Sequence, residues 1–131
     1  MQLSEKFHKN NSCSVDVIRK IEAELNKPFP ASYIDFLCWS NGGEGQSENR
    51  KRKYIYLWRC EDIPQYNKDY VIQKWLTTDI IAFGMEGDYG YAFDYRGTEE
   101  PQIIGFDFGN LDICDVCCEA GTFDEFIKDW L

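Results

Sequence analysis

Three short apolar segments separated by turn-forming residues occupy the second half of this 131-residue chain. They cover residues 79–84, 90–95 and 102–108, and each is followed by a turn signal of the Gly-Asp, Arg-Gly or Gly-Asn type. Runs of this length with such dipeptides are typical of consecutive hairpins, because these residues tolerate the backbone conformations of tight turns. The pattern therefore predicts an antiparallel meander of strands.

Helical patterns lie on both sides of these strands. Apolar residues recur at helical spacing over 15–26, and a second helix is predicted over 31–40, directly after Pro30. Near the C-terminus, Thr122 and Glu125 have the spacing of a capping box and predict a terminal helix.

The remaining segments complete the expected layout. Residues 54–59 alternate like a strand, with Tyr54, Tyr56 and Trp58 on one face. Residues 44–53 contain the basic run Arg50–Lys53 and are expected to form an exposed loop, and residues 61–76 a turn followed by a helix. Helices around a block of strands predict an α+β fold, a single domain over residues 1–131 with a mostly antiparallel sheet flanked by N-terminal helices and a C-terminal helix.

The charge of the chain is unevenly distributed. Residues 1–60 hold ten Lys or Arg and seven Asp or Glu, a net charge of +3, whereas residues 61–131 hold four and sixteen, a net charge of −12. An acidic surface repels phosphate backbones and anionic lipids and attracts a basic partner, although it can also serve only solubility. We therefore expect neither a nucleic-acid ligand nor a membrane.

Two compositional features bear on location and recognition. No apolar run reaches the roughly 18–20 residues that cross a bilayer, and the polar start lacks the apolar stretch of a signal peptide, so a cytoplasmic protein is expected. Aromatic residues make up 16% of the chain, and we expect some of these rings at the surface, where they serve binding.

The six cysteines suggest neither a disulfide framework nor a metal site. Cys13, Cys38 and Cys60 are isolated and are expected to pack as small apolar side chains. Cys114 and Cys117 have the spacing of half a zinc site, and Cys118 follows, but a closed site needs four ligands and the chain has no second pair of this type. We predict buried thiols, no metal and no cofactor.

Three patterns in the chain share the order and spacing of one known family. They are Ile18-x-x-Ile21-Glu22-x-x-Leu25 with Phe29-Pro30-x-x-Tyr33-x-x-Phe36-Leu37 and Asn41-Gly42-Gly43, then Ile81-Ala82-Phe83-Gly84 with Gly87-Asp88 and Tyr91-x-Phe93-Asp94, and finally Thr122-Phe123-Asp124-Glu125-Phe126-Ile127. Together they resemble the SUKH superfamily of Smi/Knr-type immunity proteins over about residues 18–127. The resemblance implies an α+β fold without catalytic activity.

The same resemblance implies a function. Bacterial members of the superfamily bind and neutralise toxins, often nucleases, that are encoded beside them, whereas eukaryotic relatives are regulatory interaction modules. We therefore predict an immunity protein that binds a cognate toxin domain, basic and of the nuclease type, without catalysis. A regulatory protein–protein interaction module unconnected to a toxin is the alternative.

Acidic and aromatic residues near two predicted turns are the candidate partner-binding site. We expect the turns to present these side chains together on one edge of the sheet. The residues are Glu86, Asp88, Tyr89, Asp94, Glu99 and Glu100.

A third interpretation is a carboxylate-based hydrolase. Asp88, Asp94 and Asp107 at strand ends could form an acid–base pair. Because the only histidine is His8, near the N-terminus, a Ser-His or Cys-His nucleophile pair is not expected, and we predict no catalytic residue.

Overall fold

The protein is built on one seven-stranded antiparallel sheet in which the strands follow each other in chain order. The computed structural model describes residues 6–46, 54–97 and 100–128. The strands are β1 (Phe7–Lys9), β2 (Gly43–Gln46), β3 (Tyr54–Leu57), β4 (Ile80–Glu86), β5 (Tyr89–Asp94), β6 (Gln102–Asp107) and β7 (Cys117–Ala120). The helices are α1 (Val15–Leu25), α2 (Ala31–Trp39), α3 (Ile63–Asp69), α4 (Ile72–Trp75) and α5 (Phe123–Lys128), with single 3-10 turns η1 (Cys60–Asp62) and η2 (Ile113–Asp115). The predicted α+β fold is confirmed.

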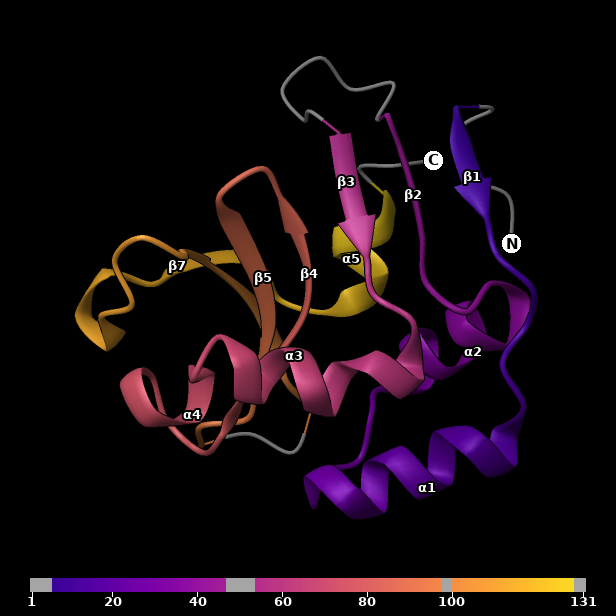
Figure 1. The fold of residues 1–131 in the computed structure, drawn as a ribbon, viewed down its shortest axis with the longest axis horizontal. Helices are drawn as coiled ribbons and strands as arrows, with labels where there is room; N and C mark the ends of the chain where they lie inside the picture. The colour runs from indigo at the N-terminus through magenta and orange to yellow at the C-terminus, as the bar shows by residue number, and fades with distance from the viewer. Residues whose placement is uncertain (1–5, 47–53, 98–99, 129–131) are drawn as a thin grey trace.

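Helices cover both faces of the sheet, as Figure 1 shows, with α3 and α4 in front and α5 behind. Behind the sheet, the ring of Tyr33 on α2 lies 4.8 Å from that of Phe93 on β5, and the ring of Phe126 on α5 lies 4.9 Å from that of Tyr91. In front, the ring of Tyr70, directly after α3, lies 4.6 Å from that of Phe108. The strands are therefore sandwiched between two helical layers around an aromatic core.

Local sequence signals account for the predicted helices. The Ser14 hydroxyl accepts a hydrogen bond from the amide of Val17 and starts α1, and Asn26 ends it in the left-handed conformation. The Thr122 hydroxyl accepts from the Glu125 amide at 3.2 Å, while a Glu125 carboxylate oxygen accepts from the Gly121 amide. This reciprocal capping begins α5 as the sequence predicts.

The region between β3 and β4 contains two short helices. The single turn η1 comes directly before α3, which begins at Ile63, and Val71 in the left-handed conformation separates α3 from α4. Asn67 on α3 is buried, accepts from the Ala82 amide at 2.9 Å and donates to the Ala82 carbonyl at 2.9 Å. The side-chain amide of Asn67 thereby takes the place of a neighbouring strand beyond the end of β3. It satisfies the buried backbone N–H and C=O groups of Ala82 on β4.

Three strands were not predicted, namely β1, β2 and β7. Residues 44–46 form a strand, so the expectation of a loop over 44–53 is wrong at its start; the run Arg50–Lys53 lies outside the described residues. The glycines of β2 conceal the usual alternation, yet a Cβ at Gly45 would stand 2.5 Å from the Cα of Phe7. Glycine is needed there because the neighbouring chain comes too close for a side chain.

The six cysteines all lie within the described residues and are unpaired. Cys13 and Cys60 are buried beside each other, and burial raises the pKa of both thiols. Cys38 is exposed, so its predicted packing is wrong. The expected buried thiols Cys114, Cys117 and Cys118 are exposed as well: Cys114 lies in the turn η2, and Cys117 and Cys118 lie on β7, the last strand of the sheet among the described residues.

Candidate functional site

The turn between β4 and β5 carries one of the predicted site residues, Asp88. Gly87 adopts a left-handed φ of 59°, which allows the tight connection, and Asp88 beside it is exposed. The Asp88 carbonyl accepts a hydrogen bond from the Phe108 amide at 2.9 Å. The end of β6 is thus held directly beside this turn.

Glu86 and Tyr89 face each other across the hairpin and are half-buried. The Tyr91 hydroxyl donates to a Glu86 carboxylate oxygen, and the Tyr89 hydroxyl donates to Glu119 on β7. Burial and the bond to Glu119 raise the pKa of Tyr89. Tyr89 therefore stays a neutral donor that joins β5 to β7.

The segment from the end of β6 to η2 adds further carboxylates. Asp107 is paired with Tyr89 in the sheet register and accepts from the Gly109 amide at 2.7 Å. Asp112 accepts from the Cys114 amide at 2.9 Å, and Asp115 accepts from Asn110 at 3.0 Å. These three aspartates are exposed, and each is held by the turn around it.

Glu86, Asp88 and Asp107 lie at one end of β5, and Asp112, Asp115 and Glu119 follow in the segment from β6 to β7. No Lys or Arg occurs within residues 80–95 or 100–120. We call this group the acidic end; it consists of Glu86, Asp88, Asp107, Asp112, Asp115 and Glu119. Glu86 and Asp88 were expected in the partner-binding site and Asp107 in a hydrolase site, whereas Asp112, Asp115 and Glu119 were not expected in either. The turn signal Gly109-Asn110 could have indicated them, because it places the residues after β6 beside the β4–β5 turn.

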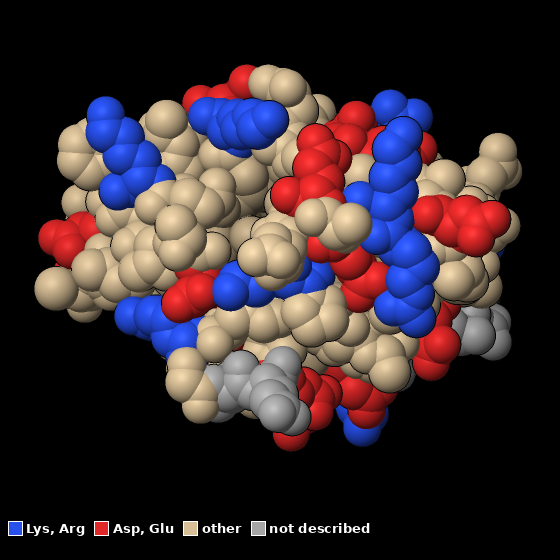
Figure 2. All heavy atoms as spheres, turned by 90° about the horizontal axis from the view of Figure 1, so that it is seen from below, with Lys and Arg blue, Asp and Glu red and all other residues tan. Residues whose placement is uncertain are grey.

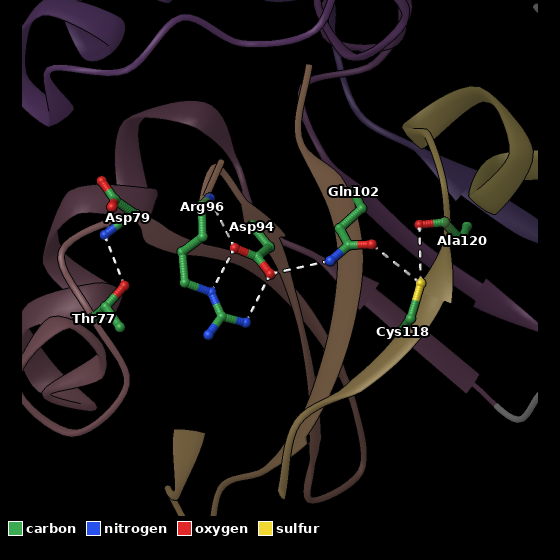
Figure 3. Close-up of polar contacts among 7 residues, drawn as sticks. All are labelled: Thr77, Asp79, Asp94, Arg96, Gln102, Cys118 and Ala120. Atoms are coloured by element: carbon green, nitrogen blue, oxygen red, sulfur yellow. Dashed lines mark hydrogen bonds and ion pairs between the residues drawn. The ribbon is translucent and has the colours of Figure 1, made fainter. Parts of the chain in front are cut away.

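The opposite end of β5 is organised differently, as Figure 3 shows. Asp94 is 1% exposed, and the Arg96 guanidinium donates to its two carboxylate oxygens from Nε at 3.0 Å and from Nη2 at 2.9 Å. The Arg96 amide and Gln102 Nε2 donate to the same carboxylate. Cys118 on β7 donates to Gln102 Oε1. Asp94 is thus fully engaged within the protein, and its predicted role in partner binding is wrong.

Burial alone would raise the pKa of the Asp94 carboxyl group. The hydrogen bonds from Arg96 and Gln102 outweigh burial, so the pKa of Asp94 lies below its ordinary value. Asp94 is therefore an ionised carboxylate with a structural role, and Arg96 neutralises its charge.

The prediction that both hairpin turns share one edge is also wrong. In an antiparallel meander the turns before and after a strand lie at its opposite ends. For the six residues of β5, the two ends are about 17 Å apart. Glu100 is exposed at the Asp94 end, and Glu99 lies outside the described residues. Of the predicted site residues, Glu86, Asp88 and Tyr89 come together.

Charges of both signs alternate on the face that contains α1, as Figure 2 shows. Ion pairs explain this pattern, since Lys27 bonds Asp79 at 2.6 Å and Arg19 bonds Glu22 at 2.7 Å. These basic residues are thus engaged by acids of the same face. Residues 80–95 and 100–120, which hold the acidic end, contain acids and no Lys or Arg.

The structure also bears on the hydrolase interpretation. Asp88 and Asp107 lie at one end of the sheet and Asp94 is buried at the other, so the three cannot form one site. Within residues 6–46, 54–97 and 100–128, no group of three or more His, Cys, Asp or Glu side chains is placed to hold a metal ion.

No helix in these ranges is long and apolar enough to cross a bilayer.

Comparison with known families bears directly on this arrangement of helices, sheet and acidic turns. Residues 12–129 match the model of the SMI1/KNR4 family (SUKH-1). The chain belongs to this family. The SMI1/KNR4 match begins after β1 and includes every helix and the other six strands, so it confirms the resemblance found in the sequence. No curated protein matches the sequence at a significant level.

Proposed function

We propose that this SMI1/KNR4-family protein is an immunity protein that binds a basic toxin domain, of the nuclease type, through its acidic end. Family membership is consistent with this role. The observation that carries the proposal is that exposed Asp88, Asp107, Asp112 and Asp115 lie in two segments, residues 80–95 and 100–120, that contain no Lys or Arg. Binding takes place without catalysis, in the cytoplasm of the cell that needs protection.

Electrostatics explains why such a surface suits this task. A nuclease carries a basic cleft for phosphates, and a cluster of carboxylates produces a long-range field of the complementary sign. That field raises the rate of association more than it raises the affinity of the final complex. Tyr89, held among the carboxylates by Glu119, adds a rigid aromatic ring of the kind that anchors interfaces.

The test compares two variants of equal net charge. Asp88→Lys, Asp107→Lys and Asp115→Lys together reverse the acidic end, and the control reverses three exposed acids elsewhere, Glu24→Lys, Asp35→Lys and Glu100→Lys. Association with the toxin domain encoded beside the gene is measured by stopped flow at several salt concentrations. We expect the first variant to associate at least about tenfold more slowly at low salt, with a weaker salt dependence, and the control to change little.

Protection of cells that express the toxin should follow the same order. The proposal fails if the two folded variants protect equally well or equally poorly, because the position of the charges would then not matter. Absence of any protection by the unaltered protein would favour the regulatory interaction module instead.

A further inference from the structure

The front face of the sheet is covered over only part of its width. Tyr54, Tyr56 and Trp58 point to this face in turn, but Trp58 is 2% exposed whereas Tyr54 and Tyr56 are 43% and 49% exposed. The cause is the position of α3, since Tyr66 and the adjacent Tyr70 pack their rings 4.8 Å and 6.2 Å from that of Trp58. Helix α3 therefore covers the sheet at Trp58 and leaves the neighbouring surface at Tyr54 and Tyr56 exposed.

A cavity of about 320 Å³ lies between α3 and the exposed part of strands β2 and β3. Its aromatic walls come from Tyr56, Trp58 and Tyr66. Its charged groups are Glu44, Arg59 and Asp62. We call this cavity the Glu44 pocket. It combines flat aromatic surfaces with carboxylates, a combination that recognises organic cations.

The second carboxylate of the pocket is that of Glu44, which has a hydrogen bond with the Tyr54 side chain. Asp62 already bonds Arg59 Nε at 3.1 Å, which neutralises both. Glu44 stands opposite Tyr56 in the register of β2 and β3, and opposite His8 on β1. Desolvation, the charge of Glu44 and the hydrogen bond with Glu44 all raise the pKa of Tyr54.

A row of rings connects the Glu44 pocket to the acidic end. Tyr66 lies 6.4 Å from Tyr70 between ring centroids, and Tyr70 lies 4.6 Å from Phe108. The Phe108 amide in turn bonds the carbonyl of Asp88. A series of packed rings therefore links the Glu44 pocket to the β4–β5 turn of the acidic end.

We propose that the Glu44 pocket receives an arginine side chain of the toxin domain. This inference rests on the proposed function and names the anchor that follows electrostatic steering. A planar guanidinium can stack on Tyr56 and Tyr66 while its N–H groups donate to Glu44, which the compact ammonium of lysine cannot do equally well. Arginine and tyrosine are also the residues that most often dominate the energetics of interfaces.

The pocket is tested first without any toxin. Nα-acetyl-arginine amide is titrated into the ¹⁵N-labelled full chain at pH 7.5, and amide shifts are recorded by NMR. The control probe is Nα-acetyl-citrulline amide, which has nearly the same shape without the charge. We expect saturable shifts at Glu44, Tyr56 and Arg59 with the arginine probe, and shifts several-fold weaker with citrulline.

Two variants locate the interaction. Glu44→Gln should weaken binding of the arginine probe at least about fivefold, because a neutral amide replaces the carboxylate. Asp115→Asn, which removes a carboxylate from the acidic end, should leave that binding unchanged. Equal binding of both probes, or unchanged binding in a folded Glu44→Gln variant, would overturn the proposal.

The complex with the toxin domain separates this inference from the proposed function. Glu44→Gln should raise the dissociation rate about tenfold with little change in the association rate, whereas reversal of the acidic end should lower the association rate. If toxin binds but dissociation from Glu44→Gln is unaltered, the arginine anchor is wrong and the immunity function stands. If the arginine probe binds while toxin does not, the proposed function is wrong, and the preference of the pocket for a guanidinium remains.

Discussion

The two ends of β5 use the same kind of residue for opposite purposes. At one end Asp94 is buried, and Arg96 and Gln102 satisfy its carboxylate oxygens. At the other end Asp88 is exposed, and its neighbours along the chain and across the sheet include further acids. A count of acidic residues therefore does not describe an acidic surface.

The difference shows where each aspartate contributes. A buried carboxylate is tolerated only when an opposite charge and hydrogen bonds compensate for its lost hydration. The interactions of Asp94 therefore contribute to the stability of the folded protein. An exposed carboxylate loses little hydration and keeps its field in the solvent, so Asp88 can act on a distant partner. Removal of the same charge at the two ends should therefore have unequal consequences.

Replacement of the buried carboxylate should have the largest effect. We expect Asp94→Asn to lower the free energy of unfolding by about 2–3 kcal/mol, because Arg96 and Gln102 lose their shared acceptor. This loss is smaller than the cost of breaking a fully buried ion pair, because the Arg96 side chain is 39% exposed and can be hydrated. Urea unfolding followed by tryptophan fluorescence measures the change. The matched variant Asp88→Asn should differ from the original by less than about 0.5 kcal/mol, and equal losses at both ends would refute the comparison.

Asn67 tests whether charge is needed for such a cost. We expect Asn67→Ala to lose about 2 kcal/mol, because the amide and carbonyl of Ala82 then lack their side-chain partner in a buried place. Gln73→Ala should lose less, about 1 kcal/mol, since Gln73 is half-buried and donates to the Ile80 carbonyl and to Asn67 Oδ1, which still accepts from the Ala82 amide in that variant. The same urea titration ranks the two variants. A loss for Asn67→Ala as small as that of an exposed residue would show that charge, not hydrogen bonding, makes buried polar groups costly to remove.

Acid should erase the contribution of Asp94. Its pKa is lowered in the folded protein, so its stabilisation is fully present above the unfolded pKa of about 3.9 and is lost as the pH falls through the lower folded value. The gap in unfolding free energy between the original protein and Asp94→Asn should therefore be constant from pH 7 to about pH 5 and shrink below about pH 4. Denaturant titrations of both proteins at each pH measure the gap, and the subtraction removes the shared titration of other acids. A gap that grows on acidification would mean that the folded pKa is raised instead.

The smallest effect is expected for charge reversal at the acidic end. Asp88→Lys with Asp115→Lys should change the free energy of unfolding by no more than about 0.5 kcal/mol, towards greater stability, because like charges around these exposed positions no longer repel. Thermal unfolding at low and high salt measures the change, which should vanish at high salt. A large loss of stability would indicate that these carboxylates hold the β6–β7 connection together, and their role in recognition could not then be separated from folding.

Local signals in the sequence were sufficient for the elements that carry them. The caps Ser14 and Thr122 and the apolar spacing behind them act within one or two turns of helix, so α1 and α5 were predictable. The hairpins of β4, β5 and β6 were predictable for the same reason, because turn residues and alternating apolar residues are neighbours in the chain. Along β3, the common face of Tyr56 and Trp58 also followed from alternation.

Tertiary structure decided what depends on residues far apart in the chain. The pairing of β2 with β1 depends on the close approach of Phe7, which requires the glycine at position 45. The position of α3 determines that Trp58 is covered and Tyr56 is exposed. Asp94 and Asp88 look alike in the sequence, but packing buries one beside Arg96 and Gln102 and leaves the other in water among acids that the register of β6 brings close. Periodicity specifies which face a side chain takes, whereas burial and electrostatic surroundings are set by the elements that pack against that face.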